Sequence, residues 1–120
     1  MDILRILLAD DNEEFRTELA DYLRSQEGVQ LIGEAKDGLE AVYYANASRP
    51  DLILMDITMP GMSGIEAARQ IKEHSPAIKI VFVTVHEEMT YQALAETLGA
   101  DGFICKSNLK RDLPTILEEF

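Results

Sequence analysis

This 120-residue chain lacks the features that mark secreted or membrane-spanning proteins. It has one cysteine and therefore cannot form an internal disulfide, which favours a reducing compartment. The N-terminal segment MDILRILLADD has too short an apolar stretch for a signal peptide, and no apolar run approaches membrane-spanning length. We therefore expect a cytoplasmic protein without membrane contact, and a buried, unreactive thiol at Cys105.

Basic residues are also scarce. The chain has 11 Lys and Arg against 22 Asp and Glu, which gives a net charge of −11. Because phosphate binding needs clustered basic side chains, this balance argues against direct contact of the chain with nucleic acid. It favours a cationic partner or a bound metal ion. The length and the hydrophobic content of 47% predict one globular domain, over residues 1–120, with a single sizeable core.

Five apolar runs alternate with amphipathic segments along the chain. The runs are Ile3–Ala9, Val29–Ala35, Leu52–Met55, Ile78–Thr84 and Gly102–Cys105. Several of them are almost continuously apolar, as in strands that helices cover on both faces. Five strand–helix units in succession predict an α/β fold with a doubly wound parallel sheet and right-handed crossovers.

The segments between the runs carry apolar residues at spacings of three and four, which predicts helices. Five stripes result: Phe15, Leu19 and Leu23; Leu39, Val42 and Tyr43; Ile65, Ala68 and Ile71; Tyr91, Leu94, Ala95 and Leu98; and Leu109, Leu113, Ile116, Leu117 and Phe120. Helix starts are expected at Ser63 and Asp37, each followed three residues later by Glu. Glycines at positions 28 and 99 are expected to end helices.

Chemically reactive side chains stand where four of the five runs end. In doubly wound sheets, ligands bind just beyond the carboxyl ends of the strands. The residues at these ends are Asp10 and Asp11, Asp56, Thr84, and Lys106. Three carboxylates at one rim repel each other unless a cation lies between them. Mg²⁺, which prefers hard oxygen ligands, is the simplest such cation.

Each of these residues, taken singly, has a simpler explanation. Asp11 or Asn12 suits the N-cap of the first helix, and Asp56 suits the turn before Pro60 and Gly61. A lysine at a strand end is often only a solvated charge, and threonine is a common strand residue. Their occurrence together at one predicted sheet edge favours a functional site.

The motifs LLADDN (7–12), PDLILMDITMPGMSG (50–64) and GADGFICK (99–106), with the Thr84 strand end between the last two, have a specific order and spacing. Over essentially its whole length the chain resembles the receiver domain of bacterial two-component response regulators. It is most similar to receivers of the NarL/FixJ/LuxR type, which precede a helix-turn-helix DNA-binding domain. The resemblance implies a flavodoxin-like (βα)5 fold with strand order 2-1-3-4-5. We expect an output domain beyond residue 120, although a stand-alone receiver would end similarly.

The resemblance also implies a metal-dependent phosphorylation site. Asp56 is the implied phosphoacceptor, modified by a sensor histidine kinase. Asp10, Asp11, Asp56 and the backbone carbonyl of Thr58 are the implied ligands of Mg²⁺. Lys106 is implied to pair with a phosphoryl oxygen. Such a domain is no enzyme beyond catalysing its own phosphorylation and a slow autodephosphorylation.

A switch is the second implied feature. In the family, the residue at Thr84 moves to the phosphoryl group and vacates space, and the aromatic ring at Phe103 swings inward. The surface formed by the fourth helix, the last strand and the last helix then changes. We expect this change to promote homodimerisation, and control of transcription through the output domain.

Four positions depart from the family pattern. Asn12 replaces a common His, and Val85 stands where a small residue is usual, so access to the phosphoacceptor is expected to be narrower. Phe103 lacks the hydroxyl of the commoner Tyr. Ser107 replaces the Pro that follows the lysine, and a trans Lys106–Ser107 bond is expected because a cis bond without proline costs about 2.5–4 kcal/mol.

Three other functions fit parts of the sequence. A flavin mononucleotide binder shares the architecture, but the acidic run 10–14 repels a phosphate. A haloacid-dehalogenase-like phosphatase also uses an aspartate, but after its first strand. A phosphorylation-independent pseudo-receiver, acting as a dimerisation module, is the main alternative, although it normally lacks one of the five site residues that this chain retains. His74 and His86 have no partner at metal-ligand spacing.

Overall fold

The computed structural model describes residues 2–85 and 89–120, without the side chains of residues 89–92. The strands are β1 (Leu4–Ala9), β2 (Val29–Ala35), β3 (Leu52–Met55), β4 (Lys79–Thr84) and β5 (Gly102–Cys105). The helices are α1 (Glu13–Arg24), α2 (Gly38–Ser48), α3 (Gly64–His74), α4 (Met89–Thr97) and α5 (Leu109–Glu119), and a 3₁₀ turn, η1 (Lys106–Asn108), precedes α5. All paired strands are parallel, in the order β2-β1-β3-β4-β5. The predicted fold class and strand order are confirmed.

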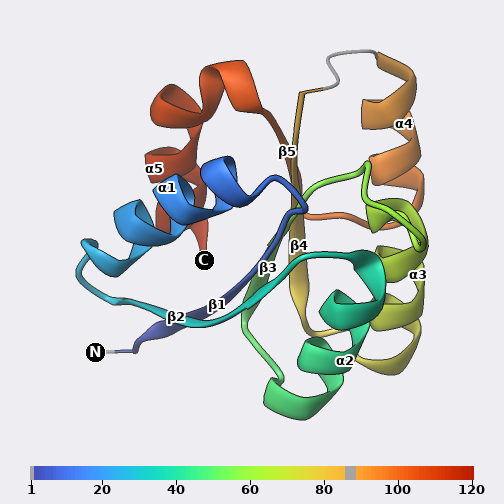
Figure 1. Ribbon diagram of the computed structural model, residues 1–120, viewed down its shortest axis with the longest axis horizontal. Coiled ribbons are helices and arrows are strands. Elements are labelled where there is room, and N and C mark those ends of the chain that lie inside the picture. Colours follow the sequence, from blue (N-terminus) through green and yellow to red (C-terminus); the bar gives the residue numbers. More distant parts are fainter. Residues whose placement is uncertain (1, 86–88) are drawn as a thin grey trace.

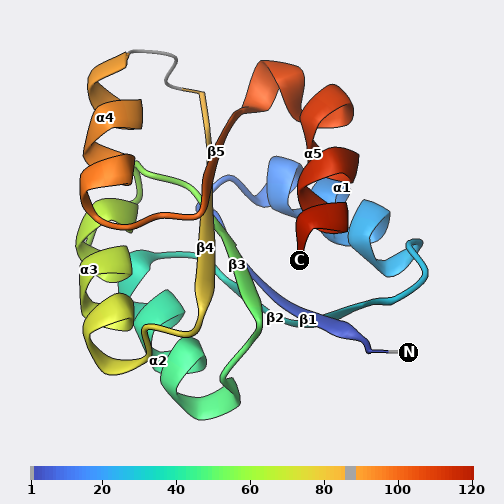
Figure 2. The same cartoon turned by 180° about the vertical axis from the view of Figure 1, so that it is seen from behind.

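Helices cover both faces of the sheet. In Figures 1 and 2, α1 and α5 lie on one face, while α2, α3 and α4 lie on the other. Along each strand, alternate side chains pack into the two hydrophobic cores, one on each face of the sheet. In β1, Ile6 and Leu8 pack toward α1 and α5, whereas Leu7 and Ala9 pack toward α2, α3 and α4. Burial on both faces explains why the strand sequences are nearly continuously apolar.

The helix boundaries follow the capping signals, with one exception. Ser63 and Asp37 are N-caps, and each side chain accepts a hydrogen bond from the backbone N–H three residues later. Gly99, with φ of 78°, ends α4 as predicted. The prediction for Gly28 is wrong, because α1 already has its C-cap at Ser25. Gly28 instead supplies a positive φ of 77° in the turn that leads into β2.

The apolar stripe predicted for the second helix is wrong for Leu39 and Tyr43, while Val42 packs against the core as predicted. Leu39 and Tyr43 are 67% and 66% exposed, and the residues that α2 buries are Gly38, Ala41 and Ala45. The helix lies so close to its neighbours that a Cβ atom at Gly38 would overlap a backbone carbonyl of the loop before α3. Only small side chains fit such a contact, so size overrides hydrophobicity in deciding which face points inward.

The other stripes face the cores, apart from individual side chains. Leu19, Leu23, Ala68, Ile71, Ala95 and Leu113 are buried. Leu94 is 40% exposed and Phe120 is 36% exposed. The side chain of Tyr91 lies outside the described part of the chain. Cys105 is only partly buried, which corrects the expectation of a buried thiol. Within the described residues, no helix has the length and apolarity needed to cross a membrane.

Candidate functional site

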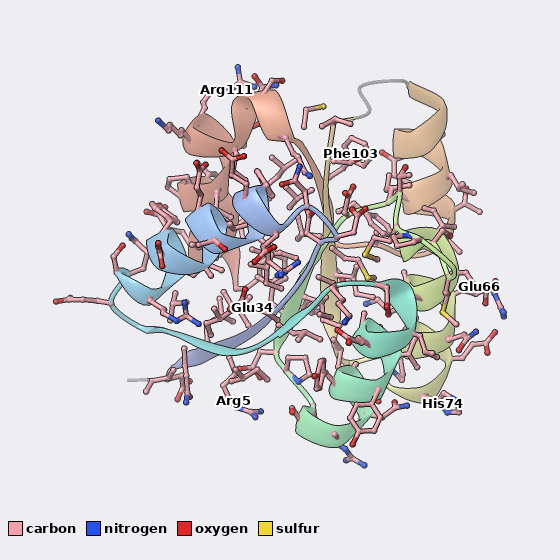
Figure 3. The ribbon with its side chains drawn as sticks, in the orientation of Figure 1. Arg5, Glu34, Glu66, His74, Phe103 and Arg111 are labelled. Atoms are coloured by element: carbon pink, nitrogen blue, oxygen red, sulfur yellow. The ribbon has the colours of Figure 1, made fainter. Side chains whose placement is uncertain are left out.

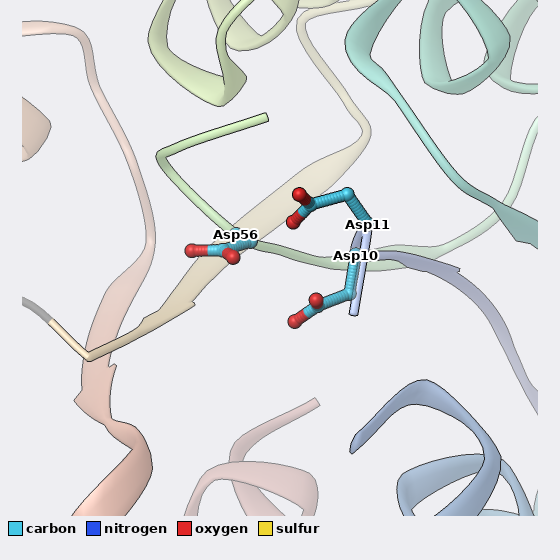
Figure 4. A group of neighbouring side chains, drawn as sticks. All are labelled: Asp10, Asp11 and Asp56. Atoms are coloured by element: carbon cyan, nitrogen blue, oxygen red, sulfur yellow. The ribbon is translucent and has the colours of Figure 1, made fainter. Parts of the chain in front are cut away.

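Three carboxylates gather where β1 and β3 end. Asp10 and Asp11 directly follow β1, and Asp56 directly follows β3. Each offers an oxygen that lies within 4.8 Å of the oxygens offered by the other two. Figure 4 shows them grouped at this edge of the sheet. Asp10 and Asp56 are 1% and 6% exposed, whereas Asp11 is exposed. The sequence prediction that these three residues share one rim is confirmed.

The backbone fixes two of these carboxylates at the sheet edge. The backbone N–H of Asp10 donates to Ala35 O at 2.9 Å, and that of Asp56 donates to Ala9 O at 2.9 Å. Each residue therefore adds one hydrogen bond beyond the last paired residue of its strand. This placement limits backbone movement at the points from which both side chains extend.

Asn12 caps the first helix, which leaves the side chain of Asp11 at the rim. Asn12 is the N-cap, since its side-chain Oδ1 accepts the N–H of Phe15 at 2.9 Å. The N–H of Asn12 in turn donates to Asp10 Oδ1 at 2.9 Å. Of the two capping residues left open by the sequence, Asn12 therefore has this role. The exposed carboxylate of Asp11 remains beside the other two at the rim.

Arg16 ties the turn after β1 to the neighbouring strand. Its guanidinium donates to the backbone carbonyl of Asp10 at 2.7 Å, and its Nε lies 3.3 Å from Glu34 Oε1 of β2. Arg24, two turns further along α1, also pairs with Glu34 at 3.2 Å. In Figure 3, Glu34 lies on β2 beneath α1. Arg16 thus supports the turn that carries two of the three carboxylates, a contact that sequence reasoning missed because its partners are 6 and 18 residues away.

Among the described residues, Lys106 is the only cationic side chain that contacts these carboxylates. Its Nζ lies 2.9 Å from Asp10 Oδ2 and 3.5 Å from Asp56 Oδ2. The lysine side chain is 13% exposed, so water screens these ion pairs weakly. On another side, Nζ lies 4.1 Å from the centre of the Phe15 ring. The sequence predicted the lysine at this site but not the aromatic contact, since Phe15 also fits an ordinary core stripe.

The surroundings of Asp56 disfavour the ionised form of its carboxyl group. Burial, and then the negative charge of Asp10, raise its pKa above the usual value. Lys106, a hydrogen bond with the Thr84 side chain and the backbone amide of Ile57 oppose this rise in the pKa. Within the described residues, Oδ1 of Asp56 is buried without a hydrogen-bond partner. A buried, unpartnered carboxylate oxygen beside two further carboxylates fits a hard divalent cation such as Mg²⁺.

Thr84 and Phe103 lie on the same face of the sheet. Thr84 ends β4 and is fully buried. It follows Phe82 by two residues, so both side chains point to one face. Phe103 pairs with Phe82 across the β4–β5 ladder and packs against the core on that face. Figure 3 shows Phe103 between β5 and α4. The two predicted switch residues are therefore diagonal neighbours on adjacent strands.

Two further predicted positions, Thr58 and Val85, are exposed near the strand ends. Thr58 is exposed two residues after Asp56, and its role as a carbonyl ligand stays a prediction. Val85 is 69% exposed directly after Thr84. His86 lies outside the described residues. No peptide bond within the described residues is cis, which confirms the trans bond expected before Ser107.

Comparison with known proteins identifies the relatives of this chain. The family described as "Response regulator receiver domain" matches residues 6–118. Response regulator protein VraR of Staphylococcus aureus is 37% identical over 112 residues, which cover 92% of this chain and 53% of VraR. The chain therefore spans about half the length of the curated relatives that it matches.

Solved structures of response regulators have the same fold as this chain. A LuxR-family two-component response regulator from an Aurantimonas species has a TM-score of 0.88 and 30% identity, covering 98% of this chain and 87% of that one. The response regulator domain of Thermotoga maritima CheB has a TM-score of 0.88 and 34% identity, covering 98% of this chain and 92% of its own. The predicted family resemblance, including LuxR-type relatives, is confirmed.

Proposed function

The chain belongs to the response regulator receiver domain family, and we propose that it accepts a phosphoryl group on Asp56 from a sensor histidine kinase. The observation that carries this proposal is the buried Oδ1 of Asp56, which has no hydrogen-bond partner among the described residues. A carboxylate nucleophile needs a free lone pair and neighbouring positive charge, and Lys106 supplies that charge at 3.5 Å. The protein acts in the cytoplasm, as its single cysteine favours.

The chemistry is a transfer of one phosphoryl group to a carboxylate oxygen. A lone pair of Asp56 attacks phosphorus and forms a new P–O bond, which gives an acyl phosphate. In transfer from a phosphohistidine, the P–N bond breaks and the imidazole takes up a proton. In transfer from acetyl phosphate, the P–O bond to the acetyl group breaks and acetate leaves. The domain catalyses only this step and a slow hydrolysis of its own acyl phosphate.

The surrounding side chains share the stabilisation of the phosphoryl oxygens. Asp10, Asp11 and Asp56, with the carbonyl of Thr58, hold Mg²⁺, which supplies positive charge to the phosphoryl oxygens when it is bound. Lys106 donates from its ammonium to one phosphoryl oxygen, and Thr84 donates from its hydroxyl to another. Because Thr84 and Phe103 are diagonal neighbours on one face of the sheet, movement of the hydroxyl changes the space beside the ring.

The output is transcriptional control by a longer protein. VraR and the Aurantimonas protein are response regulators, and the latter is of the LuxR family. The curated relatives extend well beyond the matched region. We propose that this chain is likewise part of a longer protein, which carries a DNA-binding helix-turn-helix domain. A pseudo-receiver role is disfavoured because all five implied site residues are present and none of the carboxylates has been replaced.

Intact-mass measurement after incubation with acetyl phosphate and Mg²⁺ tests this function. We expect one added phosphoryl group in the natural chain and none in Asp56→Asn. Removal of Mg²⁺ with a chelator should suppress the labelling. Asp51→Asn is the matched control, because Asp51 is an exposed aspartate directly before β3 and should not affect labelling. Labelling that persists in Asp56→Asn would show that another residue is the acceptor.

A further inference from the structure

The ammonium group of Lys106 lies between two carboxylates and an aromatic ring. Asp10 and Asp56 contact Nζ at 2.9 and 3.5 Å, and the Phe15 ring centre lies 4.1 Å away. A cation within about 6 Å of a ring centre is attracted by the negative face of the π system. The lysine side chain is 13% exposed, so this attraction acts with little screening by water.

Phe15 also belongs to a closed series of contacts that begins and ends on Asp10. Asp10 Oδ1 accepts the N–H of Asn12, and Asn12 Oδ1 accepts the N–H of Phe15, each at 2.9 Å. The Phe15 ring then faces Lys106 Nζ, which returns to Asp10 Oδ2. The helix cap therefore fixes the position of the ring relative to the same carboxylate that the lysine contacts.

We propose that Phe15 is a positioning residue that acts through Lys106, because its ring face holds the ammonium between Asp10 and Asp56. This proposal rests on the proposed function, in which Lys106 donates to a phosphoryl oxygen carried by Asp56. The two carboxylates compete for the ammonium, and Asp10 is the closer one. The ring attracts the cation as well, so that Lys106 stays within reach of Asp56.

Loss of the ring face changes the surroundings of the ammonium while leaving an apolar side chain in place. Phe15→Leu retains a hydrophobic residue but removes the π face. The ammonium then contacts hydrocarbon at this position and loses the attraction of the ring. Phe15→Tyr retains the face. Tyr22→Leu is the matched control, because Tyr22 lies two turns along α1, packs against the same core and lines the same groove between α1 and α5.

The experiment measures the rate of phosphorylation by acetyl phosphate at saturating Mg²⁺. We expect Phe15→Leu to be about two- to thirtyfold slower, which corresponds to the usual range of cation–π energies. Phe15→Tyr should retain a rate within about twofold of the natural chain, and Tyr22→Leu should leave the rate unchanged. A Phe15→Leu rate equal to the natural rate would overturn the proposal. If Phe15→Leu does not fold, as judged by circular dichroism, Phe15→Met serves as the variant without a ring.

A double-mutant cycle separates positioning of Lys106 from a general structural effect. In a Lys106→Met background, Phe15→Leu should not slow the residual reaction further, because the group that the ring acts on is absent. An equal slowing in both backgrounds would overturn the proposal.

Nuclear magnetic resonance provides a measurement that does not depend on phosphorylation. The ring current of Phe15 should shift the Lys106 ε-methylene signals upfield, and the shift should disappear in Phe15→Leu. If the natural chain is never phosphorylated, the proposed function fails, while this spectrum still decides whether the ring holds the lysine. Unshifted signals in the natural chain would refute the contact.

Discussion

The Asp56 carboxylate is destabilised by its own surroundings. It is buried, it lies beside the Asp10 carboxylate, and its Oδ1 has no hydrogen-bond partner within the described residues. Lys106 compensates this charge only in part, because it lies closer to Asp10 than to Asp56. Clustered groups with a perturbed pKa are typical of sites that bind cations or carry out chemistry. The cost in stability is therefore expected to be recovered when a cation binds.

Asp56→Asn is expected to stabilise the metal-free protein at neutral pH by about 1 kcal/mol, because the amide removes a charge that burial and the neighbouring Asp10 disfavour. The pKa of Asp56 is raised in the folded state, so the stability associated with its protonated form is lost as the pH rises through that pKa. The difference between the two proteins should therefore be small near pH 4 and largest near pH 7. Urea unfolding in the presence of a chelator at both pH values measures it. A larger difference at the lower pH would contradict the assigned cause.

Saturating Mg²⁺ provides the control for this prediction. A cation that binds only the folded state stabilises it, so Mg²⁺ should raise the stability of the natural chain more than that of Asp56→Asn. Equal stabilisation of both proteins by Mg²⁺ would show that Asp56 does not bind the cation.

At the scale of elements, the start of α3 holds the loop that follows Asp56. The N–H of Gly64 donates to the carbonyl of Ile57 at 2.7 Å. A Cβ atom at Gly64 would overlap the carbonyl oxygen of Asp56. Glycine is therefore required here for the close approach of two backbone segments, although its φ is ordinary. The first residue of α3 thus limits how far the backbone of Asp56 can move.

Gly64→Ala is expected to lower the free energy of unfolding by about 1–3 kcal/mol, because steric overlap outweighs the better helix propensity of alanine. It should also slow labelling by acetyl phosphate, since the displaced backbone carries Asp56. Gly33→Ala is the control, because a Cβ atom there meets only Leu7 Cδ1 at 3.4 Å. Chemical denaturation and intact-mass kinetics test both variants. An unchanged free energy of unfolding in Gly64→Ala would show that the loop after Asp56 can move to accommodate the added methyl group.

The second helix shows how an element can be predicted while its orientation is not. Its N-cap at Asp37 is visible in the sequence, and so is its helical length. The inward face is not visible, because Ala41 and Ala45 compete with the larger Leu39 and Tyr43 for the interior. Close approach to the adjacent loop excludes large side chains and decides the outcome.

At the scale of the whole molecule, the net charge of −11 affects association with like-charged copies. Two such chains repel each other, and the repulsion is screened over about 8 Å at 0.15 M salt and about 3 Å at 1 M. A dimer that forms on phosphorylation must therefore overcome this repulsion through its interface. Charge alone favours the monomer at low ionic strength.

We predict that beryllofluoride with Mg²⁺, which mimics the phosphoryl group, increases self-association and that added salt strengthens the dimer. Sedimentation velocity with and without beryllofluoride, at two salt concentrations, measures both effects. Asp56→Asn is the control and should not respond to beryllofluoride. A natural chain that remains monomeric under all these conditions would contradict the homodimer.

The alternation of strands and helices, and the residues at the strand ends, could be predicted from the amino-acid sequence. Strands buried on both faces are nearly continuously apolar, so a charged residue directly after such a run marks where β1, β3 and β5 end. Asp10, Asp56 and Lys106 were therefore predictable at one edge of a parallel sheet, while their proximity depended on the strand order that the family resemblance implied. The three runs Val29–Ala35, Leu52–Met55 and Gly102–Cys105 match the observed strands residue for residue.

Contacts between distant residues, and the inward face of α2, depend on how the elements pack and could not be predicted. Phe15 faces Lys106, and Arg16 reaches both Asp10 and Glu34, because α1 packs beside the end of β5 and over β2. A local pattern of hydrophobicity carries no information on such distances. The same holds for Oδ1 of Asp56, whose lack of a hydrogen-bond partner among the described residues depends on how the neighbouring elements pack. Spacing along the chain specifies the elements, while packing between them specifies the electrostatics of the site.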